Sequence, residues 1–411
     1  MSAGKVRIVG GGLTGVLAAF EALRLGYRDI ELFERFDQLG GSALPRQAHG
    51  LELRDRRIYF GQPGDPARSL LESAGLRFDD VENRFGSVSC GPGGELAIGH
   101  DFAGPVLRSR SLDLNAPAGD SLADRIRAYP SDIAAQLNRY CQWSLGAWLD
   151  EIHADAAGAL GIERVHPTGS DVVQLARLKR AAPLYDGLYG IPRAMWGRLQ
   201  NATASLPEGG LIAFFRACRR ELERASVKVR TETLASPREL KLDHAAGDLL
   251  VWAADAAALY KPAGLEPPAS FRKAVASYTF KARYAGPAPF YVRNFTADGA
   301  VFQIYVYESR GQVLLTAECV SEAADGELRR EIHRLMSAFG GASLVLGDQV
   351  AADHRTRDGY PSVAEVRGMQ MLRAAYGREL GQGFVLASRR FNELRQDMTA
   401  ARDAVAARVA A

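Results

Sequence analysis

A glycine-rich turn near the N-terminus has the residue types and spacing of a phosphate-binding loop. The sequence of residues 10–15, GGGLTG, fits the pattern Gly-x-Gly-x-x-Gly. In such a turn Gly10 permits the tight bend, Gly12 lets the backbone approach a pyrophosphate, and Gly15 allows close packing of a helix on the sheet. The N–H groups at the start of that helix face the phosphates. The turn predicts a dinucleotide site that contains Gly10, Gly12, Leu13, Thr14 and Gly15.

An acidic residue follows at the distance that ribose binding requires. Glu34 lies 19 residues after Gly15 and ends a segment with the pattern of a strand. A carboxylate there accepts hydrogen bonds from ribose hydroxyls and disfavours the 2′-phosphate of NADP. Arg35 and the glycine pair Gly40-Gly41 follow closely. The alternatives are a solvated acid at a strand end and an ordinary glycine turn.

The elements that must position these residues form a β-α-β unit. A β-branched strand is expected at residues 5–9, an apolar-periodic helix at about 13–25 and a second strand at 29–34. Gly26 ends the helix, as a glycine after the last turn commonly does. The N-terminal segment therefore predicts a Rossmann-like opening.

Later segments predict a discontinuous domain. Helices are expected at 131–151, 211–225, 327–339 and 399–410, and strands at 227–231, 248–253, 301–307, 313–319 and 384–387. The simplest architecture is an α/β fold whose Rossmann-like domain is discontinuous in sequence and carries an inserted mixed α+β substrate domain. We assign residues 1–60, 200–262 and 345–411 to the first, and residues 61–199 and 263–344 to the second.

Composition excludes several classes of function. A net charge of +3 over 411 residues gives no reason to expect nucleic acid or a membrane surface as a partner. The four cysteines are widely spaced, which fits neither a zinc site nor a disulfide framework, so we expect a cytoplasmic protein without a metal. We expect a small-molecule substrate, and leave a homodimer open.

Two segments resemble a family of flavoproteins. Glu34 followed by Gly40-Gly41 is similar to the FAD-dependent amine oxidase-like superfamily. The closing segment, with Ser388-Arg389 and Asp397-Met398, resembles the end of UDP-galactopyranose mutases. The resemblance implies an FAD-binding domain, with Arg389 at the pyrophosphate and Asp397-Met398 and the following helix against the flavin. The N-terminus of such a helix stabilises the negative charge of a reduced flavin. Without the resemblance, Asp397 would be a plain helix cap.

The substrate-site motifs depart from the mutase pattern. The family's Gly-x-His-Ile-Phe-His signature corresponds to residues 56–61, RRIYFG, which contain no histidine. Its tyrosines before the final Asp-Met are replaced, here by Glu393, Arg395 and Gln396. Arg57 or Tyr59 beside a flavin would suit an anionic or carbonyl group, and Arg293 resembles an arginine that holds the mutase diphosphate. We take Arg57, Tyr59 and Arg293 as candidate catalytic residues; core or rim positions are the alternative.

Three functions remain open on these grounds. The first, which we favour, is an FAD-dependent oxidoreductase acting on a small polar substrate, with an anionic compound and a sugar nucleotide both left open. The second is a mutase-like isomerase, in which reduced flavin attacks a sugar without net oxidation. The third is a flavoprotein that has lost its catalytic groups.

Overall fold

The structure is a computed structural model that describes most of the chain. The described residues are 4–54, 59–82, 84–90, 95–99, 107–109, 119–156, 164–168, 171–181, 183–190, 193, 203–236, 239–240, 247–269, 271–339, 343–358, 361–388 and 391–410. All structural statements below refer to these residues.

The N-terminal segment folds as the predicted β-α-β unit. β1 (Lys5–Val9), α1 (Leu13–Arg24) and β2 (Asp29–Phe33) follow one another with short connections. β1 and β2 pair in parallel, with Ile8 opposite Leu32. Residues 15–22 of α1 are all buried, because the helix packs between the sheet and other helices.

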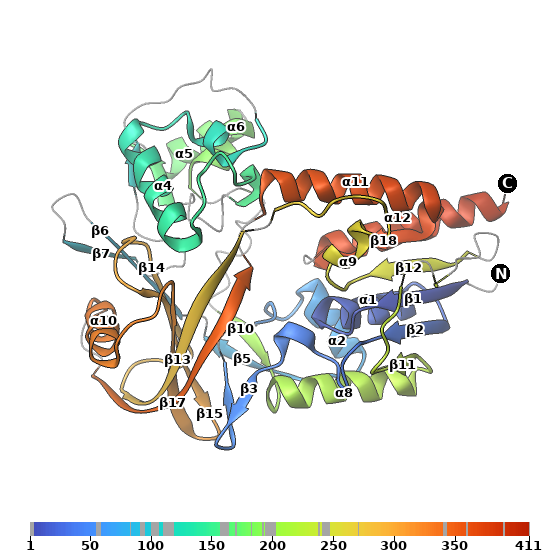
Figure 1. The fold of residues 1–411 in the computed structure, drawn as a ribbon, viewed down its shortest axis with the longest axis horizontal. Coiled ribbons are helices and arrows are strands. Elements are labelled where there is room, and N and C mark those ends of the chain that lie inside the picture. The colour runs from blue at the N-terminus through green and yellow to red at the C-terminus, as the bar shows by residue number, and fades with distance from the viewer. Residues whose placement is uncertain are drawn as a thin grey trace.

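Strands from distant parts of the chain complete a five-stranded parallel sheet. Its order is β11-β2-β1-β12-β18, where β11 is Lys228–Arg230, β12 is Leu249–Trp252 and β18 is Phe384–Leu386. One face is covered by α1, α2 (Pro66–Ser73), α8 (Gly210–Arg224) and α12 (Phe391–Ala410). The other face is covered by α9 (Ala257–Tyr260) and α11 (Val363–Glu379). The predicted Rossmann-like α/β fold is confirmed, and Figure 1 shows both chain termini at the outer end of this unit.

A second, mostly antiparallel sheet has seven strands in the order β17-β13-β16-β15-β14-β6-β7. Their bounds are β6 Arg84–Cys90, β7 Leu96–Gly99, β13 Arg272–Tyr284, β14 Phe290–Asn294, β15 Val301–Ser309, β16 Gln312–Cys319 and β17 Leu344–Asp358. The predicted pairing of β15 with β16 is confirmed. Helix α10 (Asp325–Ser337) covers one face with an apolar core (Figure 1).

A helical lobe lies over one end of the second sheet (Figure 1). It contains α3 (Leu122–Ile126), α4 (Ser131–Leu145), α5 (Val172–Ala181) and α6 (Pro183–Leu188), and a short parallel pair, β8 (Leu107–Ser109) and β9 (Val165–Pro167). Its core reaches Phe295 and Phe302 of the sheet. The lobe is also tied to the start of α11, since the N–H of Val363 donates to the Glu151 carbonyl at 3.0 Å.

Short elements join the two sheets. The 3-10 turn η1 (Gly41–Ala43) leads into a hairpin of β3 (Arg46–Ala48) and β4 (Leu51–Leu53). β5 (Phe78–Glu82) pairs with β10 (Thr203–Pro207), which leads directly into α8. In Figure 1, β3 lies between the second sheet and α8.

Two of the predicted domain boundaries are wrong. Residues 66–82 were assigned to the substrate domain, but Leu70 and Leu71 of α2 lie in the core of the Rossmann-like domain. Residues 345–358 were assigned to the Rossmann-like domain, but they form β17, which pairs with β13. The residues of β17 are largely polar and alternate in exposure. This pattern does not indicate which strand β17 pairs with, because the partner strand lies far away in the sequence.

The last helix begins earlier than predicted. α12 starts at Phe391 rather than at about Thr399, so Asp397 and Met398 lie inside the helix and not before it. Met398 is fully buried in the core that α12 shares with α1, whereas Asp397 is exposed. Leu394, Met398, Ala401 and Val405 form one apolar stripe at helical spacing, and its burial extends the helix through the polar residues beside it. The predicted placement of Asp397-Met398 at the start of a helix is therefore wrong.

Replacing Met398 with alanine tests this packing. We expect the Met398→Ala variant to lose about 2–5 kcal/mol of unfolding free energy, because truncation leaves a cavity in the core. Denaturant unfolding measures the loss. Met371 of α11, which is 52% exposed, provides the matched control; its replacement with alanine should change stability by no more than about 0.5 kcal/mol. Equal losses in the two variants would contradict the burial of Met398.

Candidate functional site

The glycine turn depends on close backbone contacts that a side chain would prevent. Gly10 has a φ of +103°, and a Cβ atom there would lie 2.7 Å from the backbone nitrogen of Ala254. A Cβ at Gly15 would lie 1.8 Å from the Gly10 carbonyl oxygen. The structure therefore gives both residues the packing role that the sequence predicts.

The start of α1 is arranged to receive an anion. Gly12 precedes the helix without a side-chain cap, and the first turn, described in full, holds no acidic residue. The first N–H groups of a helix have no acceptor within the helix, and they carry the positive end of its dipole. A Cβ added at Gly12 would meet only the Gly40 carbonyl oxygen, 4.0 Å away, among the described residues outside its own helix and chain neighbours. A pyrophosphate could thus approach Gly12, Leu13 and Thr14 from this open side.

Glu34 is part of the turn rather than a solvated strand end. Its side chain is buried, and its Oε2 accepts from the Gly11 N–H at 2.6 Å. Its Oε1 accepts from the Phe36 N–H at 3.0 Å. A carboxylate has about four acceptor positions, so both oxygens keep capacity for ribose hydroxyls. The adjacent Arg35 lies at the surface, with its guanidinium 4.5 Å from the centre of the Phe36 ring.

The glycine pair packs directly on the turn. The N–H of Gly40 donates to the Gly11 carbonyl at 2.8 Å, and Gly40 and Gly12 form a parallel bridge. Gly40 has a φ of +124°, and a Cβ there would collide with Leu44 and Phe215. Residues 10–15, Glu34 and Gly40-Gly41, which are separate in sequence, therefore form one structural unit, here called the dinucleotide turn.

The segment that follows connects the dinucleotide turn to the second sheet. From Gly41 to Arg46 the chain can span at most about 17 Å. Nε of Arg46 lies 3.3 Å from a carboxylate oxygen of Asp353 on β17. The N–H of Arg54 donates to the Tyr307 hydroxyl at 2.7 Å. Residues 46–54 and 59–60 thus lie between the two sheets, and Phe60 packs on Phe214 of α8 with ring centres 5.3 Å apart.

The sheet face that packs on residues 46–54 and on Tyr59, here called the inner face, carries two rows of side chains. Strand register places one row across six strands: Ser87, Arg293, Gln303, Glu318, Ser277 and Asp353. The next row on the same face contains Phe85, Tyr291, Tyr305, Thr316, Thr279 and Ala351. Alternate residues of each strand point to the opposite face and pack under α10. Six polar members of these rows are buried: Ser87, Arg293, Glu318, Ser277, Thr316 and Thr279. Because polar groups are costly to bury, this concentration makes the inner face a candidate ligand site.

Tyr59 lies on the second row. Its hydroxyl is 3.0 Å from the Tyr305 hydroxyl, and Tyr305 in turn stacks on Tyr307 with ring centres 4.9 Å apart. Burial raises the pKa of the Tyr307 hydroxyl, so Tyr307 stays protonated at neutral pH. Arg57, predicted beside Tyr59, lies outside the described residues.

Arg293 lies on the first row but points toward the helical lobe. It is 4% exposed, which excludes a solvated strand end. Its Nε and Nη2 atoms both donate to the Tyr140 hydroxyl of α4, at 3.0 and 2.9 Å. Tyr59 and Arg293 therefore share the inner face but occupy different parts of it.

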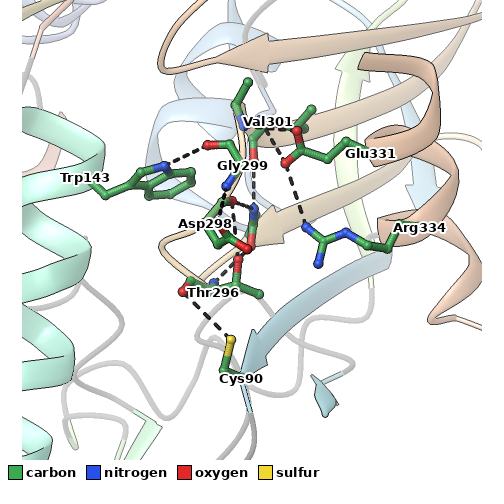
Figure 2. Close-up of polar contacts among 10 residues, drawn as sticks. Cys90, Trp143, Thr296, Asp298, Gly299, Val301, Glu331 and Arg334 are labelled. Atoms are coloured by element: carbon green, nitrogen blue, oxygen red, sulfur yellow. Dashed lines mark hydrogen bonds and ion pairs between the residues drawn. The ribbon is translucent and has the colours of Figure 1, made fainter. Parts of the chain in front are cut away.

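The turn that follows Arg293 is held from both sides of the sheet. Figure 2 shows the Trp143 ring nitrogen of α4 directed at the Gly299 carbonyl, at 2.9 Å. From α10, the Glu331 carboxylate accepts from the N–H groups of Ala300 and Val301, at 2.9 and 3.1 Å. These contacts hold residues 299–301 at the start of β15. The side-chain amide of Asn294, the residue after Arg293, donates to the Asp298 and Val301 carbonyls and so joins the end of β14 to the same turn.

The remaining predicted residue, Arg389, lies outside the described residues. The sequence analysis missed an ion pair on the inner face, in which Arg355 of β17 donates to Glu318 of β16. It also missed the tyrosines of the second row. The alternation of Gln303, Tyr305 and Tyr307 with apolar residues was the available signal, since it marks one polar face of a strand.

Among the described residues, no three or more His, Cys, Asp or Glu side chains are arranged to hold a metal ion. No described helix combines the length and apolar character needed to cross a bilayer.

Comparisons with known proteins agree with this geometry. Residues 8–73 match the family described as NAD(P)-binding Rossmann-like domain. A stretch of 39 residues is 56% identical to tryptophan 2-monooxygenase of Pantoea agglomerans pv. gypsophilae, which is 10% of this chain and 7% of that enzyme. The chain thus spans only a small fraction of that relative.

Solved structures match nearly the whole chain at low identity. A reduced UDP-galactopyranose mutase has a TM-score of 0.62 at 14% identity, covering 98% of this chain and 93% of that one. A putative protoporphyrinogen oxidase from Exiguobacterium sp. 255-15 has a TM-score of 0.59 at 17% identity, covering 100% and 99%. A putrescine oxidase variant has a TM-score of 0.56 at 14% identity, also covering 100% and 99%. The resemblance to mutases and amine oxidases is confirmed at the level of the fold.

The contact at Gly15 yields a stability prediction. We expect Gly15→Ala to lower the free energy of unfolding by about 3 kcal/mol, because the new methyl group overpacks against the Gly10 carbonyl. Thermal or denaturant unfolding measures the change. The control is Gly377→Ala within α11, where a Cβ would meet no described atom within 4 Å; this variant should be neutral or more stable by up to about 1 kcal/mol. A Gly15→Ala protein as stable as the control would refute the close contact.

Proposed function

We propose that this chain is an FAD-dependent oxidoreductase that acts on a small polar substrate. The observation that carries the proposal is the position of residues 46–54 and 59–60, which lie between the dinucleotide turn and the polar rows of the inner face. A cofactor bound at the turn and a substrate bound at the inner face would then be neighbours.

The residues of the dinucleotide turn fit FAD. The N-terminus of α1 and the open side of Gly12 would hold the pyrophosphate, and Glu34 would hold ribose hydroxyls. A 2′-phosphate would place a second negative charge near this buried carboxylate, which disfavours NADP. Arg389 as a further pyrophosphate ligand remains part of the proposal.

The chemistry of the inner face suits a polar substrate. A bound FAD supplies two-electron redox chemistry. Around it, the hydroxyls of Tyr59 and Tyr305 would orient a carbonyl or hydroxyl group of the substrate, and protonated Tyr307 holds the Arg54 backbone in place. The burial of Tyr291, Tyr305 and Thr316 would limit access of water to this part of the inner face.

Replacing Gly12 with alanine separates cofactor binding from folding. We expect Gly12→Ala to weaken FAD binding by about tenfold or more, about 1.4 kcal/mol, because the methyl group enters the side from which the pyrophosphate approaches. Its thermal stability without added FAD should match that of the parent, since Gly12 has no positive φ and no close neighbour on that side. Flavin titration followed by fluorescence measures the affinity. Undiminished FAD affinity in this variant would argue against the proposed cofactor site.

A mutase-like, redox-neutral isomerase is a second candidate. The similarity of the whole chain to a UDP-galactopyranose mutase fold favours it. The substituted tyrosine positions weigh against it: Glu393 accepts from the Ser388 hydroxyl, and Arg395 lies 3.5 Å from the buried Glu21 carboxylate. Glu393 thus contacts the segment before α12, and Arg395 contacts α1; these contacts compete with binding of a sugar diphosphate.

An anaerobic assay distinguishes the candidates. The protein is reduced once with dithionite and given a UDP-sugar without an electron acceptor; steady conversion would establish the isomerase and overturn the oxidoreductase. Obligate consumption of an oxidant with each turnover, for an amine, hydroxy or carbonyl substrate, is the result we expect. A flavin spectrum unchanged by every substrate tested would instead point to a flavoprotein without catalysis.

A further inference from the structure

A buried arginine that neither the dinucleotide turn nor the tyrosine row uses lies where the helical lobe meets the second sheet. Arg164, immediately before β9, is 2% exposed. Its guanidinium lies 4.7 Å from the centre of the Phe295 ring, and its Nη1 is 3.5 Å from the Ser89 hydroxyl. Its Nε has no hydrogen-bond partner among the described residues. A buried guanidinium N–H without an acceptor costs free energy, so this atom needs an explanation.

A second positive charge lies beside the first. The Arg293 guanidinium is also 4.7 Å from the centre of the Phe295 ring. Burial, together with the charge of Arg293, lowers the pKa of Arg164 to about 10. Arg164 therefore remains charged at neutral pH, next to another cation and within a largely apolar core. A negative charge would stabilise the buried guanidinium of Arg164 in such surroundings.

Two buried hydroxyl groups belong to the same junction. Ser87 of β6 pairs with Arg293 across the strands, and Ser144 lies one helical turn after Tyr140, the residue that holds Arg293. The hydroxyl oxygens of both serines are buried and lack a hydrogen-bond partner among the described residues. The junction thus presents three unsatisfied N–H or O–H donors: Arg164 Nε, Ser87 Oγ and Ser144 Oγ. Phe295 belongs to the turn that α4 and α10 hold in place, as the Trp143 and Glu331 contacts in Figure 2 show.

We propose that this junction is an oxyanion-binding site, in which Arg164, Ser87 and Ser144 donate to the oxygens of a carboxylate or phosphate group and Arg293 contributes positive charge. A planar guanidinium edge and hydroxyl donors match both groups, which accept several hydrogen bonds at once. If the chain acts as proposed above, the oxyanion is that of an anionic substrate, since Arg293 and the tyrosines of the second row share the inner face. Water could satisfy the hydrogen bonds but would not offset the charge.

Thermal unfolding of the full-length protein in sodium phosphate, sodium acetate and sodium chloride, at equal ionic strength and pH 7, tests the site. A ligand that binds the folded state alone raises the melting temperature with its concentration. We expect phosphate or acetate, but not chloride, to stabilise the parent protein. Stabilisation by acetate alone would identify a carboxylate site, by phosphate alone a phosphate site, and by both a general oxyanion site. Equal responses to all three salts would overturn the proposal.

Two variants locate the effect. Arg164→Met should raise the apparent Kd for the stabilising anion at least tenfold, whereas Arg177→Met, which removes an exposed arginine from α5, should leave it unchanged. Ser144→Ala tests the same site with a change small enough to preserve folding, and should raise the Kd about threefold to tenfold, as expected for one lost hydrogen bond. Unchanged anion response in Ser144→Ala and in any folded Arg164→Met protein would refute the site. Neither readout requires flavin or turnover, so this result stands apart from the outcome for the proposed function.

Discussion

The architecture depends on a backbone contact that only glycine allows. The Gly15 Cα lies so close to the Gly10 carbonyl that a methyl group would overlap it, and Gly10 itself adopts a left-handed conformation against Ala254. This contact fixes the direction of α1 relative to β1, and therefore the position of its first N–H groups. Glu34 and Gly40 then bond to the same turn through Gly11. A strand, a helix start and a loop become one rigid unit.

Residues that follow this unit in the sequence, 46–54 and 59–60, reach the second sheet. Arg46 contacts β17 of the inner face, and Arg54 and Tyr59 both contact β15. Neighbouring residues point in opposite directions: Tyr59 faces the sheet, and Phe60 enters the core of the Rossmann-like domain. The two sheets are therefore in contact at the place where, in our proposal, cofactor and substrate would meet.

The helical lobe adds a different kind of environment to the same sheet. Near Tyr59 the inner face is rich in hydroxyl groups, whereas near α4 it holds two buried arginines around one phenylalanine. The turn at residues 295–300 helps to hold these surroundings in place. Its Gly299 carbonyl is hydrogen-bonded to α4 on one side, and its Ala300 N–H is hydrogen-bonded to α10 on the other. One sheet face can thus orient an uncharged group at one end and a negative charge at the other.

The sequence by itself determined the dinucleotide turn, its flanking strands and helix, and the pairing of β15 with β16. These features depend on residues that are neighbours in the chain or on regular periodicity, so local patterns carry them. Only the tertiary structure decided that Met398 is a core residue, that β17 joins the second sheet, and that six strands align Arg293, Glu318 and Asp353 in one row. Each of these depends on the register or burial of segments far apart in sequence, and a change of one residue in register would send every side chain of a strand to the opposite face.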